Sequence, residues 1–292
     1  MTQEFPFRQI GIVGTGRVAQ TLAVALRSAG KASPLVWGRS PERAERVGAL
    51  ASGAVASSLA DLMARCDAIA IAVADDAITG IVADAAALPM VHRPFVFHVS
   101  GGSGAAMLEP LERAGASVAA VHPAMTFTGD PAAEVTRMAG ARFAVTAPDR
   151  QAMALAHAIV EALGGVSVEI AEAHRPLYHA ALCHGANHLV TLLSGAMGAL
   201  SAAGVVQPAE LLAPLVRAAL ENSLANGFAA LSGPVLRGDG GTVGGHLAAL
   251  ATHDPDLLPA YRAMAAETLA ELERRGATPG ALHGLLADPQ PM

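Results

Sequence analysis

The most constraining feature of the chain is the segment IGIVGTGRVAQTLAVAL, residues 10–26, in which a short strand breaks on glycines and continues as a helix. Gly14 permits a tight strand-to-helix turn, Gly16 lets the backbone approach a pyrophosphate, and Ala19 keeps the helix close to the sheet. The first turn of that helix presents free N–H groups and a partial positive charge. This GxGxxA pattern predicts a dinucleotide-binding site, although a glycine-rich turn can also be only a turn.

The alternation of strand-like and helical segments extends this prediction over the first half of the chain. Strands are expected at residues 9–13, 34–37, 67–74, 94–99, 117–121, 141–146 and 166–170. Strands that alternate with helices form a parallel, doubly wound sheet, so the expected fold class is α/β of the Rossmann type. From about Ala173 onward helix follows helix, which predicts an all-α C-terminal domain.

A chain of 292 residues is long for one core and suits two domains. We predict a dinucleotide-binding domain over residues 1–172 and a helical domain for substrate binding and dimerisation over residues 173–292.

Composition excludes several classes of protein. A net charge of -6 and an aromatic content of 3% provide neither the basic patch nor the stacking surface of a nucleic-acid-binding protein. Mean hydropathy is +0.41, but no apolar run of about eighteen residues is uninterrupted, so a membrane protein is not expected. Residues 1–9 lack the apolar core of a signal peptide, and the only cysteines are Cys66 and Cys183. We therefore expect a cytoplasmic protein.

The end of the second expected strand, WGRSPER, indicates which dinucleotide binds. A chain built for NAD offers Asp or Glu about twenty residues after the glycines, where it binds the ribose 2′-hydroxyl. This chain offers Arg39, Ser40 and Arg43 instead, and guanidinium groups match the geometry of a 2′-phosphate. Ser40 can also cap a helix that begins at Pro41, and both roles are compatible. We predict NADP as the cofactor.

Two further loops at the carboxyl ends of strands complete the expected cofactor site. In AVADDAI, Asp75 and Asp76 begin a turn and a helix, and helix capping is the simpler interpretation. In FHVSGGSG, His98 and Ser100 share one face, and the glycines admit a ligand close to the backbone. A serine-hydrolase elbow is excluded there because GxSxG spacing is absent. The predicted cofactor-binding residues are Gly14, Thr15, Gly16, Arg17, Val18, Arg39, Ser40, Arg43, Ala74, Asp75, Ser100 and Gly101.

Candidate catalytic residues begin with His122, which ends a strand where Pro123 prevents continuation. The segment HRPLYHAALCHGANHLV predicts a helix that is apolar on nearly every side and therefore buried. His179, Cys183 and Asn187 fall on one face of this helix at successive i+4 positions.

His184 and His188 form a second i, i+4 pair with zinc-type spacing. A metal site is not predicted, because no Asp or Glu between residues 172 and 210 completes the ligands.

A polar turn in LSGPVLRGDGGTVGGHLAAL supplies the last candidates. A helix is expected to end at residues 233–234, and another to begin with Thr242 and His246. Arg237 can anchor a substrate carboxylate, with Asp239 fixing the arginine. The alternative interpretation is a solvated interhelical turn with a cap.

The chain resembles a family of bacterial proteins in which a Rossmann-like domain precedes a helical domain of unknown function. The resemblance covers nearly the whole chain and is carried by GIVGTGRVA, AVADDAI, HVSGG, HPAMTF, YHAALCHGANHLV and SGPVLRGDGGTVGGHL, of which the last two are the most specific. The family is similar to the pyrroline-5-carboxylate reductases and the β-hydroxyacid dehydrogenases, with a C-terminal domain like that of 6-phosphogluconate dehydrogenase.

This resemblance implies an activity and a set of site residues. Some members look like a second type of ketopantoate reductase, which implies reduction of a 2-oxo acid with NADPH. The Tyr-His pair and following Asn of the family map onto Tyr178, His179 and Asn187. Its Arg-Gly-Asp motif, with later Thr and His, maps onto Arg237, Asp239, Thr242 and His246. Relatives in the pyrroline-5-carboxylate reductase group pair through this domain, so a homodimer is expected.

The mechanism is narrowed by a missing residue. The β-hydroxyacid dehydrogenases use a lysine to polarise the carbonyl, whereas the only lysine in this chain is Lys31, before the second strand. A proton for carbonyl reduction must then come from His, Tyr or water, with His122 and His179 best placed and Asn187 binding the carbonyl oxygen. A protonated imine needs no strong acid, so imine reduction is the alternative reaction. A non-catalytic sensor of NADP is the alternative of another class.

Overall fold

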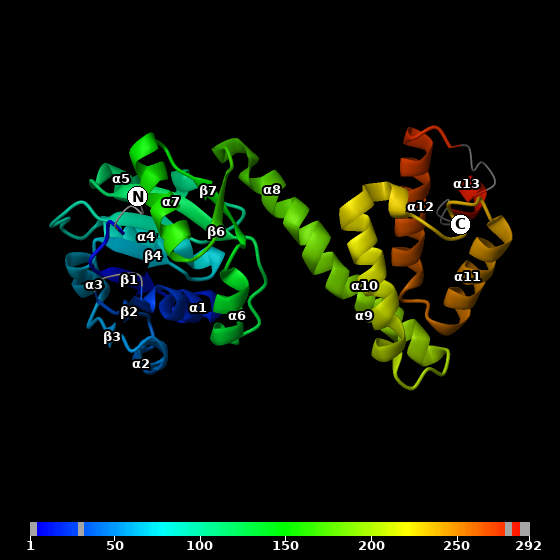
Figure 1. Ribbon diagram of the computed structural model, residues 1–292, viewed down its shortest axis with the longest axis horizontal. Coiled ribbons are helices and arrows are strands. Elements are labelled where there is room, and N and C mark those ends of the chain that lie inside the picture. The colour runs from blue at the N-terminus through cyan, green and yellow to red at the C-terminus, as the bar shows by residue number, and fades with distance from the viewer. Residues whose placement is uncertain (1–4, 29–31, 278–281, 287–292) are drawn as a thin grey trace. The chain divides into compact units, whose positions relative to one another are not determined.

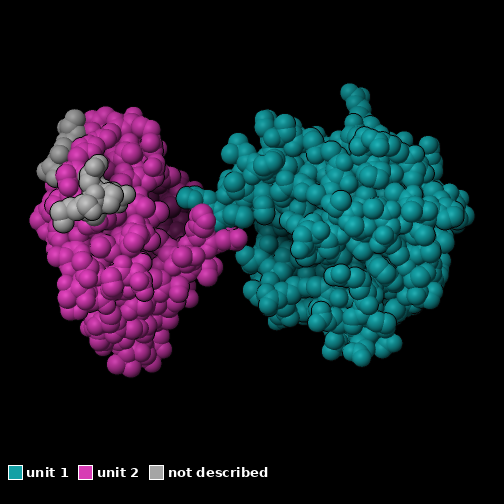
Figure 2. All heavy atoms as spheres, turned by 180° about the vertical axis from the view of Figure 1, so that it is seen from behind, with its two compact units in different colours: residues 1–184 teal, residues 185–292 magenta. Residues whose placement is uncertain are grey.

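The computed structural model describes residues 5–28, 32–277 and 282–286, so Lys31 lies outside the described residues. The chain divides into two compact units, residues 1–184 and 185–292, which Figure 2 colours separately. We refer to them as unit 1 and unit 2 and describe each by itself. The division falls twelve residues after the predicted boundary at 172/173, inside a helical segment.

Unit 1 is built on an eight-stranded sheet in the order β3-β2-β1-β4-β5-β6-β7-β8 (Figure 1). The strands are β1 (Ile10–Val13), β2 (Leu35–Trp37), β3 (Ala54–Val55), β4 (Ala68–Ile71), β5 (Phe95–His98), β6 (Ser117–Pro123), β7 (Arg142–Thr146) and β8 (Val166–Glu169). This arrangement confirms the Rossmann-type fold class. Two details of the prediction are wrong: β3 was not expected, and β7 runs antiparallel to β6 while the other neighbours are parallel.

Helices cover both faces of this sheet. The helices of unit 1 are α1 (Arg17–Ala25), α2 (Pro41–Leu50), α3 (Leu59–Arg65), α4 (Asp75–Ala86), α5 (Glu109–Arg113), α6 (Pro131–Met138), α7 (Arg150–Ala162) and α8 (Arg175–Leu182). Helices α1, α2, α6 and α7 contribute to one buried apolar cluster, and α3, α4 and α5 to another. Successive strand residues point to opposite faces, so Phe95 and Phe97 join the first cluster and Val96 the second. The result is a three-layer domain with two cores.

Among the described residues, unit 2 consists of helices joined by turns and contains no strand. Its helices are α9 (His188–Ala202), α10 (Pro208–Asn226), α11 (Gly240–His253), α12 (Leu258–Arg274) and α13 (His283–Leu286). A small core joins α11, α12 and α13 and contains Val243, Leu247 and Leu269. Helices α9 and α10 pack on each other, yet neither contains a buried residue. The expectation that the apolar helix after Pro176 is buried is therefore wrong for this chain taken alone.

No helix within the described ranges combines the length and apolar character needed to cross a bilayer.

Candidate functional site

The β1–α1 turn assigns different roles to its two glycines. Gly14 has φ +132°, its N–H donates to Trp37 O (2.9 Å), and a Cβ there would lie 2.1 Å from Ala72 O. Only glycine fits this position. Gly16 is the N-cap of α1 with φ -75°, and a Cβ there would meet no atom within 4 Å. Gly14 is thus required by the turn, whereas Gly16 leaves open space in front of the helix N-terminus. Ala19 is fully buried, as close packing of α1 requires.

An open cleft of about 710 Å³ lies beside this turn, between α1 and α2. Its lining residues are Thr15, Gly16, Arg17, Gln20, Arg43, Arg46, Val47, Ala49 and Leu50. Three guanidinium groups therefore border one cleft, and this concentration of positive charge favours an anionic ligand. We call it the arginine cleft.

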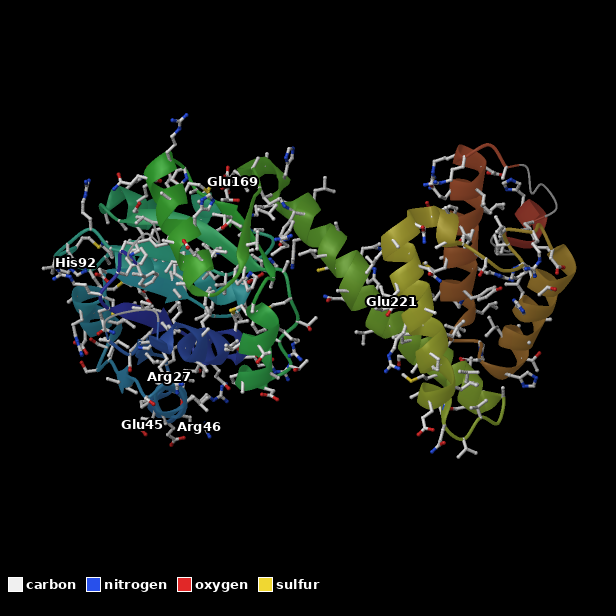
Figure 3. The ribbon with its side chains drawn as sticks, viewed as in Figure 1. Arg27, Glu45, Arg46, His92, Glu169 and Glu221 are labelled. Atoms are coloured by element: carbon white, nitrogen blue, oxygen red, sulfur yellow. The ribbon has the colours of Figure 1, made fainter. Side chains whose placement is uncertain are left out.

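The lining of the arginine cleft includes one of the two arginines predicted to bind a 2′-phosphate. Arg43 borders it as predicted, whereas Arg39 is exposed and does not line it. Arg46 was missed, although its i+3 spacing from Arg43 on α2 was a usable signal; Figure 3 labels Arg46 on that helix. Ser40 caps α2, because its Oγ accepts from the Arg43 N–H (3.4 Å) and Pro41 follows at the first position.

The loop after β4 has the geometry expected if Asp75 and Asp76 only stabilise the start of a helix. Ala74 is the N-cap of α4, and Asp75 and Asp76 occupy its first turn. All three residues are exposed. Carboxylates in a first turn interact favourably with the helix dipole, so their position has a structural explanation.

The loop after β5 is organised by a buried histidine. His98 Nδ1 accepts from the Ser100 N–H (3.2 Å), so its Nε2 carries the proton and donates to Gly104 O (2.9 Å). Burial lowers the pKa of His98, which keeps the ring neutral in this arrangement. The Ser100 Oγ is buried and finds no hydrogen-bond partner among the described residues. His98 therefore shapes the loop, and Ser100 leaves one polar atom unused.

Side chains from β6 and α8 meet at this loop. His122 Nδ1 lies 2.9 Å from the Tyr178 hydroxyl oxygen, and the His122 and His179 ring centroids are 6.0 Å apart. A Cβ on Gly101 would lie 2.6 Å from His179 Cδ2 and 2.9 Å from His122 Nε2. Glycine is thus needed for both rings to reach the loop. We call His122, Tyr178, His179 and Gly101 the histidine–tyrosine cluster.

The electrostatics of the cluster keep His122 uncharged. Burial lowers the pKa of His122 to about 4, and the charge of Arg175 adds to this effect. Burial also raises the pKa of Tyr178, which Arg175 partly opposes. At neutral pH the pair is therefore a neutral imidazole and a protonated phenol.

Arg175 supports the histidine–tyrosine cluster, and sequence reasoning missed it. It is fully buried, and its guanidinium donates to Thr146 Oγ1 (2.8 Å), Ala120 O (2.9 Å) and Ala144 O (3.1 Å). Its Cζ lies 5.9 Å from the centroid of the Tyr178 ring. These bonds join the start of α8 to β6 and β7, which positions Tyr178 opposite His122. The residues adjacent to Arg175 in the sequence do not distinguish it from a solvent-exposed arginine, because its partners are distant along the chain.

The helix that continues from α8 departs from the predicted spacing. Cys183–Asn187 form a π-helical turn, so the i+4 relation between Cys183 and Asn187 does not hold as in an α-helix. Cys183 Sγ lies 3.7 Å from His179 Nε2 in unit 1. Asn187, His184 and His188 are exposed, and Asn187 belongs to unit 2. Within the described ranges no group of three or more His, Cys, Asp or Glu could hold a metal ion.

The polar turn of unit 2 has the geometry of a helix cap. Asp239 is the N-cap of α11, and its carboxylate accepts from the Thr242 N–H (3.0 Å) and hydroxyl (2.7 Å). These hydrogen bonds lower the pKa of Asp239, and the charge of Arg237 contributes less. Arg237 is exposed, and His246 pairs with Tyr261 (Nδ1 to hydroxyl oxygen, 2.8 Å). The preceding helix α10 ends at Asn226, earlier than expected.

Two family models match successive stretches of the chain, and the second match crosses the division between unit 1 and unit 2. Residues 4–123, which lie within unit 1, match the model of a Rossmann-like domain. Residues 141–268 match the model of a domain of unknown function, DUF2520. The chain therefore combines a Rossmann-like domain with a DUF2520 domain, which confirms the resemblance stated from the sequence. No curated protein matches it in sequence.

Solved structures share the fold over most of the chain. A Bacteroides fragilis protein assigned as an NADP oxidoreductase is 19% identical, with TM-score 0.74 over 90% of this chain and 98% of its own. An imine reductase from Myxococcus stipitatus in complex with NADP⁺ is 16% identical, with TM-score 0.65 over 92% and 95%. Pyrroline carboxylate reductase from Plasmodium falciparum with NADP bound is 16% identical, with TM-score 0.55 over 76% and 80%. At these identities the likeness establishes the fold.

Proposed function

We propose that the protein is an NADPH-dependent oxidoreductase that reduces a small 2-oxo acid, with ketopantoate as the leading substrate. The observation that carries the proposal is the arginine cleft beside the open N-terminus of α1, where Arg17, Arg43 and Arg46 surround space for a phosphorylated ligand. The NADP-containing structures that share the fold support the same cofactor. The substrate assignment is supported by the family resemblance alone.

The residues present fit NADPH. Gly14, Thr15, Gly16, Arg17 and Val18 would hold the pyrophosphate at the first turn of α1, and Arg43 and Arg46 the 2′-phosphate. The remaining predicted contacts are Arg39, Ser40, Ala74, Asp75, Ser100 and Gly101. Bound NADPH supplies the hydride.

The chain's own side chains supply binding and protons in this proposal. His122 and His179 lie at the loop after β5, where groups for proton transfer are needed. Asn187 donates a hydrogen bond to the carbonyl oxygen as negative charge develops there. Arg237 binds the substrate carboxylate, with Asp239 holding the arginine by charge.

Imine reduction is the second candidate function. It is favoured by the position of the only lysine, Lys31, before β2 in the sequence, and by the imine reductase that shares the fold. We further propose a homodimer formed through the helical domain, supported by exposed leucines and valines on α9 and α10. Both cysteines are free, which is consistent with a cytoplasmic protein.

The test has a binding arm and a turnover arm. Fluorescence titration is expected to give tighter binding of NADPH than of NADH, and Arg43→Ala and Arg46→Ala should weaken NADPH binding while leaving NADH binding unchanged. Arg39 was also predicted to bind the 2′-phosphate but does not line the cleft. The variant Arg39→Ala shows whether Arg39 contributes to the preference for NADPH.

The turnover arm follows oxidation of NADPH with ketopantoate, other 2-oxo acids and cyclic imines. Preferential turnover of a 2-oxo acid supports the first candidate and preferential turnover of an imine the second. Tight NADPH binding without turnover of any substrate favours the sensor.

Turnover also tests Asn187. Asn187→Ala should leave NADPH binding intact and lower kcat about 10²-fold. A lower melting temperature with normal turnover would remove Asn187 from the site.

A further inference from the structure

The chain contains two tyrosines, and each forms the same hydrogen bond to a histidine. Tyr178 lies 2.9 Å from His122 Nδ1, and Tyr261 lies 2.8 Å from His246 Nδ1. The ring planes are nearly perpendicular in both pairs, at 84° and 88°. The pairs are matched in geometry, so any difference in their chemistry must come from their surroundings.

Their surroundings differ in burial and charge. His246 is exposed on α11 and interacts electrostatically with Asp239 of the cap. The Tyr178 pair lies at the carboxyl ends of β5 and β6, against the Gly101 turn. In a Rossmann-type sheet, ligands bind outside these strand ends. Of the two pairs, this one occupies the position where a substrate of the proposed reaction is expected.

We propose that Tyr178 donates the proton to the substrate and that His122 restores it, an inference that rests on the proposed function. His122 holds the phenol oxygen in place through Nδ1, and its Nε2 lies beside the Gly101 backbone. Arg175 lies under the Tyr178 ring and stabilises a phenolate by its charge. Tyr178 is then a catalytic residue, and Arg175 a positioning residue.

The proton steps balance as follows. The substrate carbon receives a hydride from NADPH, and the C=O π pair moves to the oxygen, which takes the proton from the Tyr178 hydroxyl. The phenolate then takes the proton on His122 Nδ1 while Nε2 takes one H⁺ from solvent, and exchange of ring protons with solvent restores the Nδ1–H tautomer, so the net reaction consumes one solvent proton. His122 is neutral before and after, and the alcohol and NADP⁺ are the products.

The charged groups around the pair are consistent with these roles. Arg175, His179 and His98 all disfavour an imidazolium at His122, in addition to its burial, so His122 passes a proton without storing one. Burial disfavours the charged guanidinium of Arg175, and the negative charge of Glu172 partly opposes this effect. Tyr178 is protonated at neutral pH, since the ordinary pKa of a phenol is about 10 and burial raises the pKa of Tyr178 further. A protonated phenol is the form that can donate.

A spectroscopic experiment tests the pair without any turnover. In Tyr261→Phe, Tyr178 is the only tyrosine, so the ultraviolet absorbance of phenolate reports its ionisation alone. Adding His122→Phe removes the N–H that stabilises the phenolate, and the pKa of Tyr178 should rise by about one unit. An unchanged or lower pKa of Tyr178 would overturn the inference.

The turnover experiment uses the matched tyrosine as its control. Tyr178→Phe keeps the ring against Arg175 and should lower kcat about 10²-fold, with an unchanged Kd for NADPH. Tyr261→Phe removes an equally short hydrogen bond and should leave kcat within about two-fold, because His246 and Tyr261 take no part in the proton step.

The outcomes separate this inference from the proposed function. If none of the tested substrates leads the wild-type protein to oxidise NADPH, the proposed function is overturned, and the inference with it. A wild-type protein that turns over while Tyr178→Phe turns over equally well overturns the inference alone. Rescue is not expected from Tyr178→His, since a second imidazole cannot keep the distance to His122 Nδ1.

Discussion

Unit 1 and unit 2 are both rich in apolar residues, but they differ in how much of that surface they bury. Unit 1 contains two cores, one on each face of its sheet. Unit 2 buries a small cluster around Val243 and Leu269, while α9 and α10 contain no fully buried residue. A sheet presents two faces that its own crossover helices cover, whereas a helix that is apolar on every side needs neighbours on every side. Apolar content therefore predicts burial only where the topology places other elements of the same unit against the apolar surface.

The largest expected effect on stability comes from a substitution in unit 1, which buries its own apolar surface. Gly14→Ala should lower the free energy of unfolding by about 3 kcal/mol or more, because φ +132° is strained for alanine and its Cβ would meet Ala72 O at 2.1 Å. Gly16→Ala is the matched control, since its Cβ enters open space and costs about 1 kcal/mol through the N-cap. Chemical denaturation measures both. Equal losses in the two variants would contradict the separate roles of these glycines.

The second prediction addresses the uncovered helices of unit 2. Leu224 on α10 is 80% exposed in the single chain, and we expect a two-fold dimer to cover it. Leu224→Glu introduces a charge into each copy of that interface and should weaken association about 10²-fold or more. Helix α10 also carries the carboxylates of Glu210 and Glu221, of which Figure 3 labels Glu221, so its surface is not uniformly apolar.

Light scattering at micromolar concentration measures this association. The control is Val91→Glu, since Val91 is 75% exposed in unit 1 and should not affect the mass. A monomeric wild type would refute the dimer, and equal dissociation of both variants would refute its location on the helical unit.

The third prediction is a pH dependence that originates in unit 1. The folded pKa of His122 is about 4, below the ordinary value of about 6.5, so between these values the unfolded chain binds more protons than the folded chain. The free energy of unfolding should therefore fall as the pH decreases from about 6.5 to about 4. For the partly exposed His122 the loss is about 2 kcal/mol.

Buried His98 acts in the same direction, because its pKa is also lowered. Denaturation at several pH values measures the slope, and His122→Gln should flatten it. A variant with the slope of the wild type would show that His122 is not held neutral by the fold.

Much of the fold could be predicted because its signals are local. The sheet can be predicted from the glycine turn at residues 14–16 and from the alternation of strand-like and helical segments. Neither signal requires knowledge of contacts between residues far apart in the sequence. The direction of β7 could not be predicted, since RFAVT is equally suited to either direction and the connection from β6 decides it. β3 has only two residues, too few for a period.

The candidate site was predictable to a smaller extent, because its contacts are long-range. His122 and His179 were singled out separately, each by its position at the end or on the face of an element. Their meeting at Gly101 depends on α8 lying against β6, which Arg175 secures through backbone carbonyls. Carbonyl acceptors have no sequence signature, so neither this arginine nor the Tyr178 hydrogen bond could be read from the chain.

The smallest expected effect separates the two interpretations of Asp239. As the N-cap of α11 it accepts two hydrogen bonds from Thr242, and Asp239→Ala should cost about 1 kcal/mol. Asparagine is an equally good cap, so Asp239→Asn should leave stability nearly unchanged while removing the negative charge near Arg237. If that charge holds Arg237 for a substrate carboxylate, Asp239→Asn raises KM for the acid with little change in kcat. If Asp239 is only a cap, KM stays at the wild-type value, and unit 2 then contributes stability but no carboxylate anchor through this turn.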